Sequence, residues 1–186
     1  MQPHISSNLF RRSVHQYCDP RRATPVLRIC RTWATTLLGM GEPSAVKILS
    51  ELPVTEFAFP GPLRDRLVDA VLSERKVSTT GLALAYEVER EPLPKPGGRF
   101  KVVDSNDHPV AVIEVTSVVV VPLGEVDLAH VVDEGEGYET IHAWRTSHEA
   151  FWQSKEMLTL LGDPTFAVED TTPVVLERFK LVERLI

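Results

Sequence analysis

The sequence predicts an α+β fold, a small β-barrel flanked by helices and preceded by an N-terminal helical extension. Residues Pro109–Val121 form a long, almost wholly apolar segment, as expected of a barrel wall buried on one face and covered on the other. Apolar residues recur at helical spacing after Pro62, and aromatic residues do so within Thr140–Leu161. We therefore expect a basic, partly disordered extension over residues 1–52 and the folded domain over residues 53–186.

The composition is that of an ordinary globular protein with an uneven charge. The 186 residues are 43% hydrophobic and 25% charged, with a net charge of −6. Residues 1–50 hold seven Lys or Arg and two acidic residues, or +5, whereas the other 136 hold 13 basic and 24 acidic residues, or −11. Because each uncompensated carboxylate repels a phosphate backbone, this charge argues against a general nucleic-acid surface. Any nucleic-acid contact is expected to be local, or the substrate to be small.

A few residue types predict the cellular location of the protein and whether it binds a metal. Cys18 and Cys30 both lie in the extension, so no disulfide framework is expected in the domain and a reducing cytoplasm is the simplest location. No apolar run approaches the roughly 20 residues of a membrane-spanning helix. Residues 1–41 hold six arginines and one acid, which suits a transit peptide, a poorly ordered leader or a start site placed too far upstream. His142 and His148 do not share a helical face, so we expect no metal, and no cofactor.

The extension itself contains two helical patterns. Residues 1–23 are expected to be loosely held. A helix from Pro25 to about Gly39 would then carry one apolar face, which docks on the domain or on a second copy to give a homodimer. Its arginines alternatively suit a nucleic-acid or membrane arm. A second short helix is predicted over Ser44–Leu52.

The first half of the domain is expected to alternate helix and strand. A helix begins at Gly61-Pro62 and lays Leu63, Leu67, Ala70 and Val71 on the core. Strands are predicted over Leu82–Val88 and Arg99–Val103, separated by a polar, proline-rich connection. A hairpin turn over residues 104–107 leads into the long apolar strand.

The second half is expected to contain more helix. A short helix is predicted within Leu123–Asp133, then a flexible acidic loop over Glu134–Tyr138. A long helix covers Thr140–Leu161, with Trp144 and other aromatics on one side. A strand begins at Thr165–Val168, and a last strand over Thr172–Leu185 has one basic face made of Arg178, Lys180 and Arg184.

Chemistry is concentrated in the segment Glu74–Gly81. Lys76 lies three residues before Thr79 and can supply a base for a hydroxyl nucleophile, provided that burial lowers the amine pKa towards neutrality. In a regular strand these two side chains point apart, so they converge only where the chain turns or bulges. The alternative is a plain helix-to-strand loop in which Lys76 caps the helix C-terminus.

Glu114 is the other candidate, because it lies between Ile113 and Val115 in the apolar strand. An ionised carboxylate there costs several kcal/mol unless a cation or donor meets it. We expect Lys76 to be that partner. A buried ion pair without any chemistry is the alternative.

A resemblance to a known family joins these segments. Pro62–Gly81, Gly98-Arg99-Phe100, Val110–Glu114, Glu134–Gly137 and Trp144–Trp152 together resemble an ASCH domain, from about Phe57 to the C-terminus. This family has a fold similar to the PUA barrel and is associated with RNA. Some members are small amidohydrolases that remove the acyl group from N4-acetylcytidine with a lysine, a threonine three residues later and a glutamate.

The resemblance implies roles for individual residues. Lys76, Thr79 and Glu114 match the catalytic pattern in order and type. Lys76 would deprotonate the Thr79 hydroxyl, which attacks the amide carbonyl, while Glu114 orients the lysine or relays the proton. Thr80 competes for the nucleophile role, and Val77 departs from the family, where a threonine often follows the lysine. The residues expected to bind substrate are Ser78, Thr80, Arg99, Glu136, Tyr138 and Trp144.

Three functions remain open at this point. The first is hydrolysis of a modified nucleoside, which the acidic composition favours. The second is an RNA-binding or RNA-cleaving module that grips single-stranded RNA through Lys76, Arg99, Arg178 and Lys180, with a steep salt dependence. The third is a non-enzymatic barrel that binds a nucleoside or another small ligand.

Overall fold

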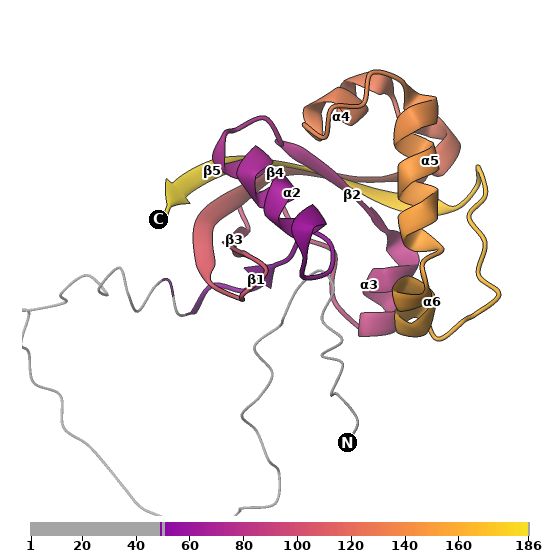
Figure 1. The fold of residues 1–186 in the computed structure, drawn as a ribbon, viewed down its shortest axis with the longest axis horizontal. Helices are drawn as coiled ribbons and strands as arrows, with labels where there is room; N and C mark the ends of the chain where they lie inside the picture. The colour runs from indigo at the N-terminus through magenta and orange to yellow at the C-terminus, as the bar shows by residue number, and fades with distance from the viewer. Residues whose placement is uncertain (1–48, 50, 186) are drawn as a thin grey trace, which may run out of the picture.

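The fold was analysed in a computed structural model, which describes residues 49 and 51–185. These residues form a five-stranded mixed sheet with helices packed around it (Figure 1). The strands lie in the order β1-β3-β4-β5-β2, and only the β1–β3 pair is parallel. Their bounds are β1 (Val54–Thr55), β2 (Ser78–Leu82), β3 (Arg99–Val103), β4 (Pro109–Pro122) and β5 (Pro173–Arg184). The α+β class is thereby confirmed.

The expected closed barrel is wrong. Among the described strands, β1 pairs with β3 and β2 pairs with β5, but these two outer strands do not pair with each other. Closure requires continuous pairing around the ring. Strand β1 is only two residues long and pairs along one edge with β3, while its other edge pairs with no described strand, so the sheet stays open. The helices predicted within residues 1–52 fall almost entirely outside the described residues.

Three of the described helices begin at capping side chains that the sequence supplies. Asp127, Thr140 and Ser154 each accept a hydrogen bond from a backbone N–H in the first turn of the helix that follows. The Ser154 cap divides the long helix predicted over Thr140–Leu161 into two. The helices are α2 (Pro62–Leu72), α3 (Ala83–Glu89), α4 (Leu128–Asp133), α5 (Ile141–Trp152) and α6 (Lys155–Leu161), with a 3-10 turn η1 (Leu123–Glu125) before α4.

Two predicted strands are corrected by the structure. The segment predicted as the strand Leu82–Val88 is mostly the helix α3, because its two alanines favour helix. No strand begins at Thr165, since Asp163 accepts hydrogen bonds from both the backbone N–H and the hydroxyl of Thr165 and forms a local turn. The strands over Arg99–Val103, Pro109–Val121 and Thr172–Leu185 are confirmed within a residue or two.

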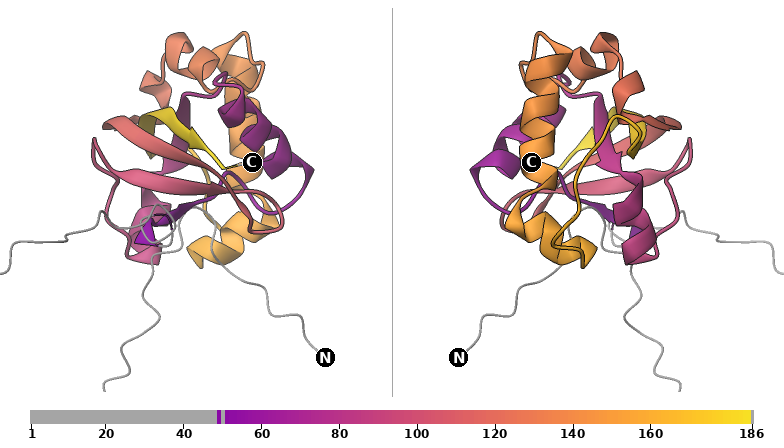
Figure 2. Two further views of the ribbon diagram at one scale, coloured as in Figure 1. Left: turned by 90° about the vertical axis from the view of Figure 1, so that its left-hand side faces the viewer. Right: turned by 90° about the vertical axis from the view of Figure 1, so that its right-hand side faces the viewer.

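The core consists of two clusters on either side of β2. One packs Phe57, Val71 and Phe179 between α2 and the sheet. The other surrounds Trp144 and Trp152 of α5. Figure 2 shows α5 standing across the end of the sheet, with α4 and its following loop above it. Strand β2 and its preceding loop therefore lie where both clusters meet.

No helix in the described part of the chain is long and apolar enough to span a bilayer.

Candidate active site around Lys76

The backbone holds Lys76 in place before β2 begins. After α2 ends, the N–H groups of Arg75 and Lys76 both donate to Ala70 O, at 2.9 and 3.0 Å. The next N–H, of Val77, donates to Asp133 O at 2.8 Å. The chain thus turns sharply off the helix, as the convergence of Lys76 with the β2 hydroxyls requires. Only 1% of Lys76 is exposed.

The buried ammonium of Lys76 is surrounded by oxygen. Its Nζ donates to Glu136 Oε1 at 2.8 Å and to the backbone oxygen of Glu134 at 3.3 Å. Glu134 Oε2 lies 3.6 Å from the same nitrogen. The ring of Phe57 approaches from another side, with its centroid 5.7 Å away. A buried lysine is stable in this form because two carboxylates oppose its charge.

The two carboxylates also decide the protonation state of Lys76. Burial alone lowers the pKa of the amine, but the charges of Glu134 and Glu136 outweigh it and raise the pKa of Lys76 above its ordinary value. The condition for a lysine base, an amine pKa lowered towards neutrality, is therefore not met. Lys76 is an ammonium in the resting site.

Glu134 is the fully buried carboxylate of the site. Its Oε1 accepts a hydrogen bond from Thr80 Oγ1 at 2.5 Å, and its Oε2 lies 3.2 Å from His148 Nε2. Burial raises the pKa of this carboxyl, but Lys76, His130 and His148 together hold the pKa well below its usual range. Because the Thr80 hydroxyl donates its hydrogen to Glu134, its oxygen accepts a hydrogen bond from His130 Nε2 at 2.9 Å.

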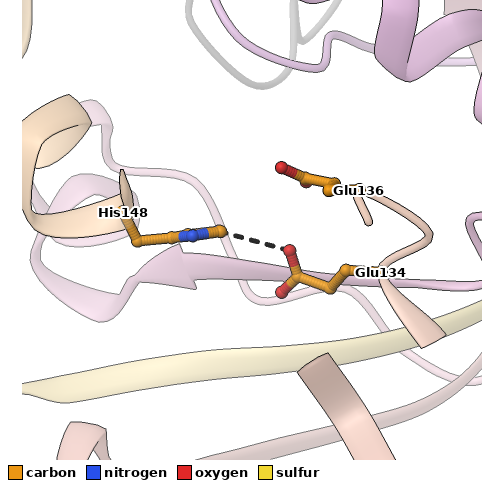
Figure 3. A group of neighbouring side chains, drawn as sticks. All are labelled: Glu134, Glu136 and His148. Carbon is orange, nitrogen blue, oxygen red and sulfur yellow. Dashed lines mark ion pairs between the residues drawn. The ribbon is translucent and has the colours of Figure 1, made fainter. Parts of the chain in front are cut away.

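His148 faces an acceptor with each ring nitrogen. Its Nδ1 donates to Trp144 O at 3.1 Å, and its Nε2 points at Glu134 (Figure 3). The imidazole also packs on the Trp144 ring at a centroid distance of 4.4 Å. Trp144 therefore holds His148 in place through its ring and its backbone oxygen.

A glycine allows the acidic loop to reach Lys76. Gly135 has φ +66°, and a Cβ at this position would lie 2.3 Å from Arg75 O. The backbone of the loop thus lies directly against the Arg75–Lys76 segment. This contact brings both Glu134 and Glu136 close to the ammonium.

Glu134, Glu136 and His148 also offer three ligand atoms within 4.8 Å of one another (Figure 3). Carboxylate and imidazole groups are suitable ligands for a divalent cation. Here, however, Lys76 Nζ already lies 2.8 Å from one carboxylate and 3.6 Å from the other. A dication would have to displace or oppose that ammonium, so the residues fit a lysine better than a metal.

The cluster borders a cavity of about 60 Å³. Phe57, Phe151 and Trp152 form much of its apolar wall. Thr79 lines it and is half-buried, and its hydroxyl makes no hydrogen bond to the rest of the described chain. The polar side chains along the wall are Lys76, Thr79, Thr80, Glu136, Ser147 and His148.

The structure brings most of the predicted substrate-binding residues to this region. Thr80 and Glu136 line the cavity, and Tyr138 donates its hydroxyl to Ser147 at 2.6 Å. Trp144 lies behind His148 and is fully buried. Ser78 donates to His130 O at 3.0 Å and so anchors α4 instead of lining the cavity.

Glu114 is not the partner of Lys76, and this expectation is wrong. Ile113 and Val115 point into the core, so alternation along β4 turns Glu114 to the opposite face. There it pairs with its cross-strand neighbours, Arg99 at 2.9 Å and Lys180 at 2.8 Å, which lower its pKa. Arg99 is likewise committed to Glu114 instead of the cavity.

The site residues missed by sequence reasoning are Glu134, His130 and, as a participant, His148. His130 and Glu134 lie four residues apart, a spacing that puts both on one side of a helix, and this was the available signal. Helix α4 is only six residues long, so its periodicity is weak.

The comparisons agree with this architecture. A family model described as the ASCH domain matches residues 56–183. The solved ASCH domain from Lactobacillus crispatus JV V101 is similar at 25% identity and a TM-score of 0.59, covering 68% of this chain and 76% of that one. Protein EF3133 from Enterococcus faecalis V583 is similar at 28% identity and a TM-score of 0.57, covering 66% and 70%. No curated protein matches the chain.

Proposed function

The chain belongs to the ASCH domain family, and on that premise we propose that it is a small amidohydrolase that removes an acyl group from a modified nucleoside of the N4-acetylcytidine type. One observation carries the proposal: a buried ammonium, an uncommitted threonine hydroxyl and a carboxylate line the same small cavity. These groups suit acyl transfer to a hydroxyl nucleophile.

Thr79 is the proposed nucleophile. Its hydroxyl is free to attack, whereas the Thr80 hydroxyl is held between His130 and Glu134. Thr79 Oγ1 would attack the amide carbonyl carbon and give up its proton to Glu136, whose carboxylate also lines the cavity. Glu136 then returns the proton to the departing amine, and water releases the acyl group from Thr79.

Lys76 takes a different role from the base implied by the family resemblance. As an ammonium it can donate a hydrogen bond to the oxyanion that develops on the carbonyl. Glu134 keeps Lys76 charged, and Thr80, His130 and His148 hold Glu134 in place. These four residues are positioning residues, because none of them is required to touch the reacting atoms.

The test is release of cytidine from N4-acetylcytidine by the purified protein and by Thr79→Ala. We expect the variant to lose turnover by at least about a hundredfold with an unchanged Tm, because Thr79 makes no hydrogen bond that the fold depends on. Thr116→Ala removes the same hydroxyl from an exposed position on β4 and serves as the matched control. Full activity of Thr79→Ala, with loss in Thr80→Val, would instead assign the nucleophile to Thr80.

RNA binding through the basic face of β5 has less support. Arg178 pairs with Asp133 at 2.6 Å and Lys180 pairs with Glu114 at 2.8 Å. Arg184 pairs with Glu74 at 3.0 Å. Cations already matched by carboxylates give a phosphate backbone little attraction.

A further inference from the structure

The size of the cavity limits what it can hold. A volume of about 60 Å³ accommodates an acyl amide but not a whole nucleoside. The sugar and base must therefore lie outside it. A second hollow of about 420 Å³ adjoins the cavity and shares Leu63, Leu67 and Glu136 with it.

We propose that this second hollow, the groove, binds a phosphate group of the substrate through Arg66 and Arg75, so that the protein acts on an acylated nucleotide in preference to a free nucleoside. This inference rests on the proposed hydrolase function. The groove lies between α2, which supplies Arg66, and the loop after α4, which supplies Gly135, Gly137 and Tyr138. Its volume lies in the range of about 300 to 1,000 Å³ typical of small-molecule sites.

The two arginines differ from most other described arginines by their partners, with Arg90 as the exception. Within the described residues, neither Arg66 nor Arg75 pairs with a carboxylate, and the only side-chain partner of Arg75 is the neutral Ser73 hydroxyl at 3.0 Å. By contrast, each of Arg64, Arg99, Arg145, Arg178 and Arg184 pairs with a carboxylate. Both groove arginines are exposed and keep donors available for a planar, bidentate contact with an oxyanion.

The charge balance of the groove favours one phosphate over many. Asp69 also lines it and opposes the arginines, while Glu136 shares the ammonium of Lys76 with Glu134 and keeps part of its negative charge. The groove therefore offers two arginines with little net charge around them, in a domain that is otherwise acidic. A single phosphate is attracted locally, but each further phosphate along a strand would meet the acidic surroundings.

We assign the base of the substrate to Tyr138, the aromatic residue of the groove. Tyr138 lines the groove, and its hydroxyl donates to the Ser147 hydroxyl. An aromatic ring held in this way offers a stacking surface for any base. The acyl amide, the base and the phosphate would then lie against the cavity, Tyr138 and the arginines respectively.

The experiment compares kcat/KM for N4-acetylcytidine, its 5′-monophosphate and a short oligoribonucleotide containing one internal N4-acetylcytidine. The proteins are the parent, Arg66→Gln, Arg75→Gln and the double variant, with Lys95→Gln as an exposed control outside the groove. We expect the monophosphate to exceed the nucleoside by on the order of tenfold, through KM, and the double variant to abolish that advantage without changing nucleoside turnover.

The outcomes separate the two proposals. A preference for the monophosphate supports the site as proposed, whereas a preference for the oligonucleotide would overturn the inference that the groove takes a single phosphate. Equal kcat/KM for nucleoside and monophosphate in the parent overturns the phosphate site but leaves the hydrolase function standing. If nothing is hydrolysed, the function fails, and calorimetric titration with cytidine 5′-monophosphate against cytidine decides the site, since equal affinities would overturn it.

Discussion

A single buried charge organises the site at the scale of residues. Lys76 is held by two carboxylates, and the more buried of them, Glu134, is itself held by Thr80 and two histidines. An ion pair of this kind contributes little net stability when intact, but removing one partner leaves a buried charge exposed to low dielectric. The geometry of the cavity therefore depends on every member of the cluster.

This dependence predicts the effect of Glu134→Gln. The amide keeps the size and the acceptor for Thr80 but removes a charge that opposes Lys76, so we expect about 3 kcal/mol loss of unfolding free energy. Urea denaturation measures it. Glu183→Gln, at an exposed position on β5, should change stability by less than about 0.5 kcal/mol. A similarly small effect of Glu134→Gln would mean that Glu136 alone suffices to hold the ammonium.

Sequence reasoning reached part of this cluster. Lys76, Thr79, Thr80 and Glu136 were predicted to belong to the site, and they line one cavity. A carboxylate in an apolar strand needs a cation, and Glu114 follows this rule. It has two cations across the strands, Arg99 and Lys180, but the face on which a strand residue lies depends on register, which one strand does not reveal.

At the scale of elements, the loop after α4 depends on its two glycines to different degrees. Gly135 and Gly137 both have positive φ, but an added Cβ at Gly135 would collide with the Arg75 backbone, whereas nothing lies within 4 Å at Gly137. Gly137→Ala should cost about 1–2 kcal/mol of strain. Gly135→Ala adds a clash with backbone that has no room to move.

We therefore expect Gly135→Ala to lower the unfolding free energy by more than about 3 kcal/mol and to reduce activity in the fraction that stays folded. Thermal denaturation of the two alanine variants side by side makes the comparison. Equal Tm values for both would show that the loop moves away from Arg75 at little cost.

The elements themselves were predictable where their pattern is long. Strands β3, β4 and β5 follow from apolar runs and turn residues, and α2 follows from its helical spacing. Helix α3 did not, because Leu84, Tyr86 and Val88 recur at every second position and thus imitate a strand. The sequence pattern also could not predict that the sheet is open, because closure depends on the pairing of strands distant in sequence.

At the scale of the whole molecule, the cluster gives stability a defined pH range. The lowered pKa of Glu134 adds stability that is complete above its ordinary value of about 4.3 and is lost as the pH falls below it. The raised pKa of Lys76 adds stability that is complete below about 10.4 and is lost as the pH rises past its folded value. The contribution of the pair is therefore constant across neutral pH.

Urea denaturation of the parent and of Glu134→Gln between pH 3 and 7 tests the predicted loss of stability at acid pH. The parent should lose stability more steeply than the variant as the pH falls, so the two curves should approach each other. Parallel curves would assign acid unfolding to the other carboxyls with lowered pKa, such as Asp104 and Asp163.

The hydrogen bond from Lys76 to Glu134 joins residues 58 positions apart in the chain. Closing a loop of that length costs roughly 3.6 kcal/mol of chain entropy beyond a constant, so the contact forms only once intervening strands have shortened the path. While Glu134 and Glu136 are still inside the ribosome, Lys76 of the nascent chain lacks the two carboxylates that oppose its charge. Lys76 therefore cannot yet be buried. The cavity therefore forms only after the loop that carries Glu134 and Glu136 has been synthesised.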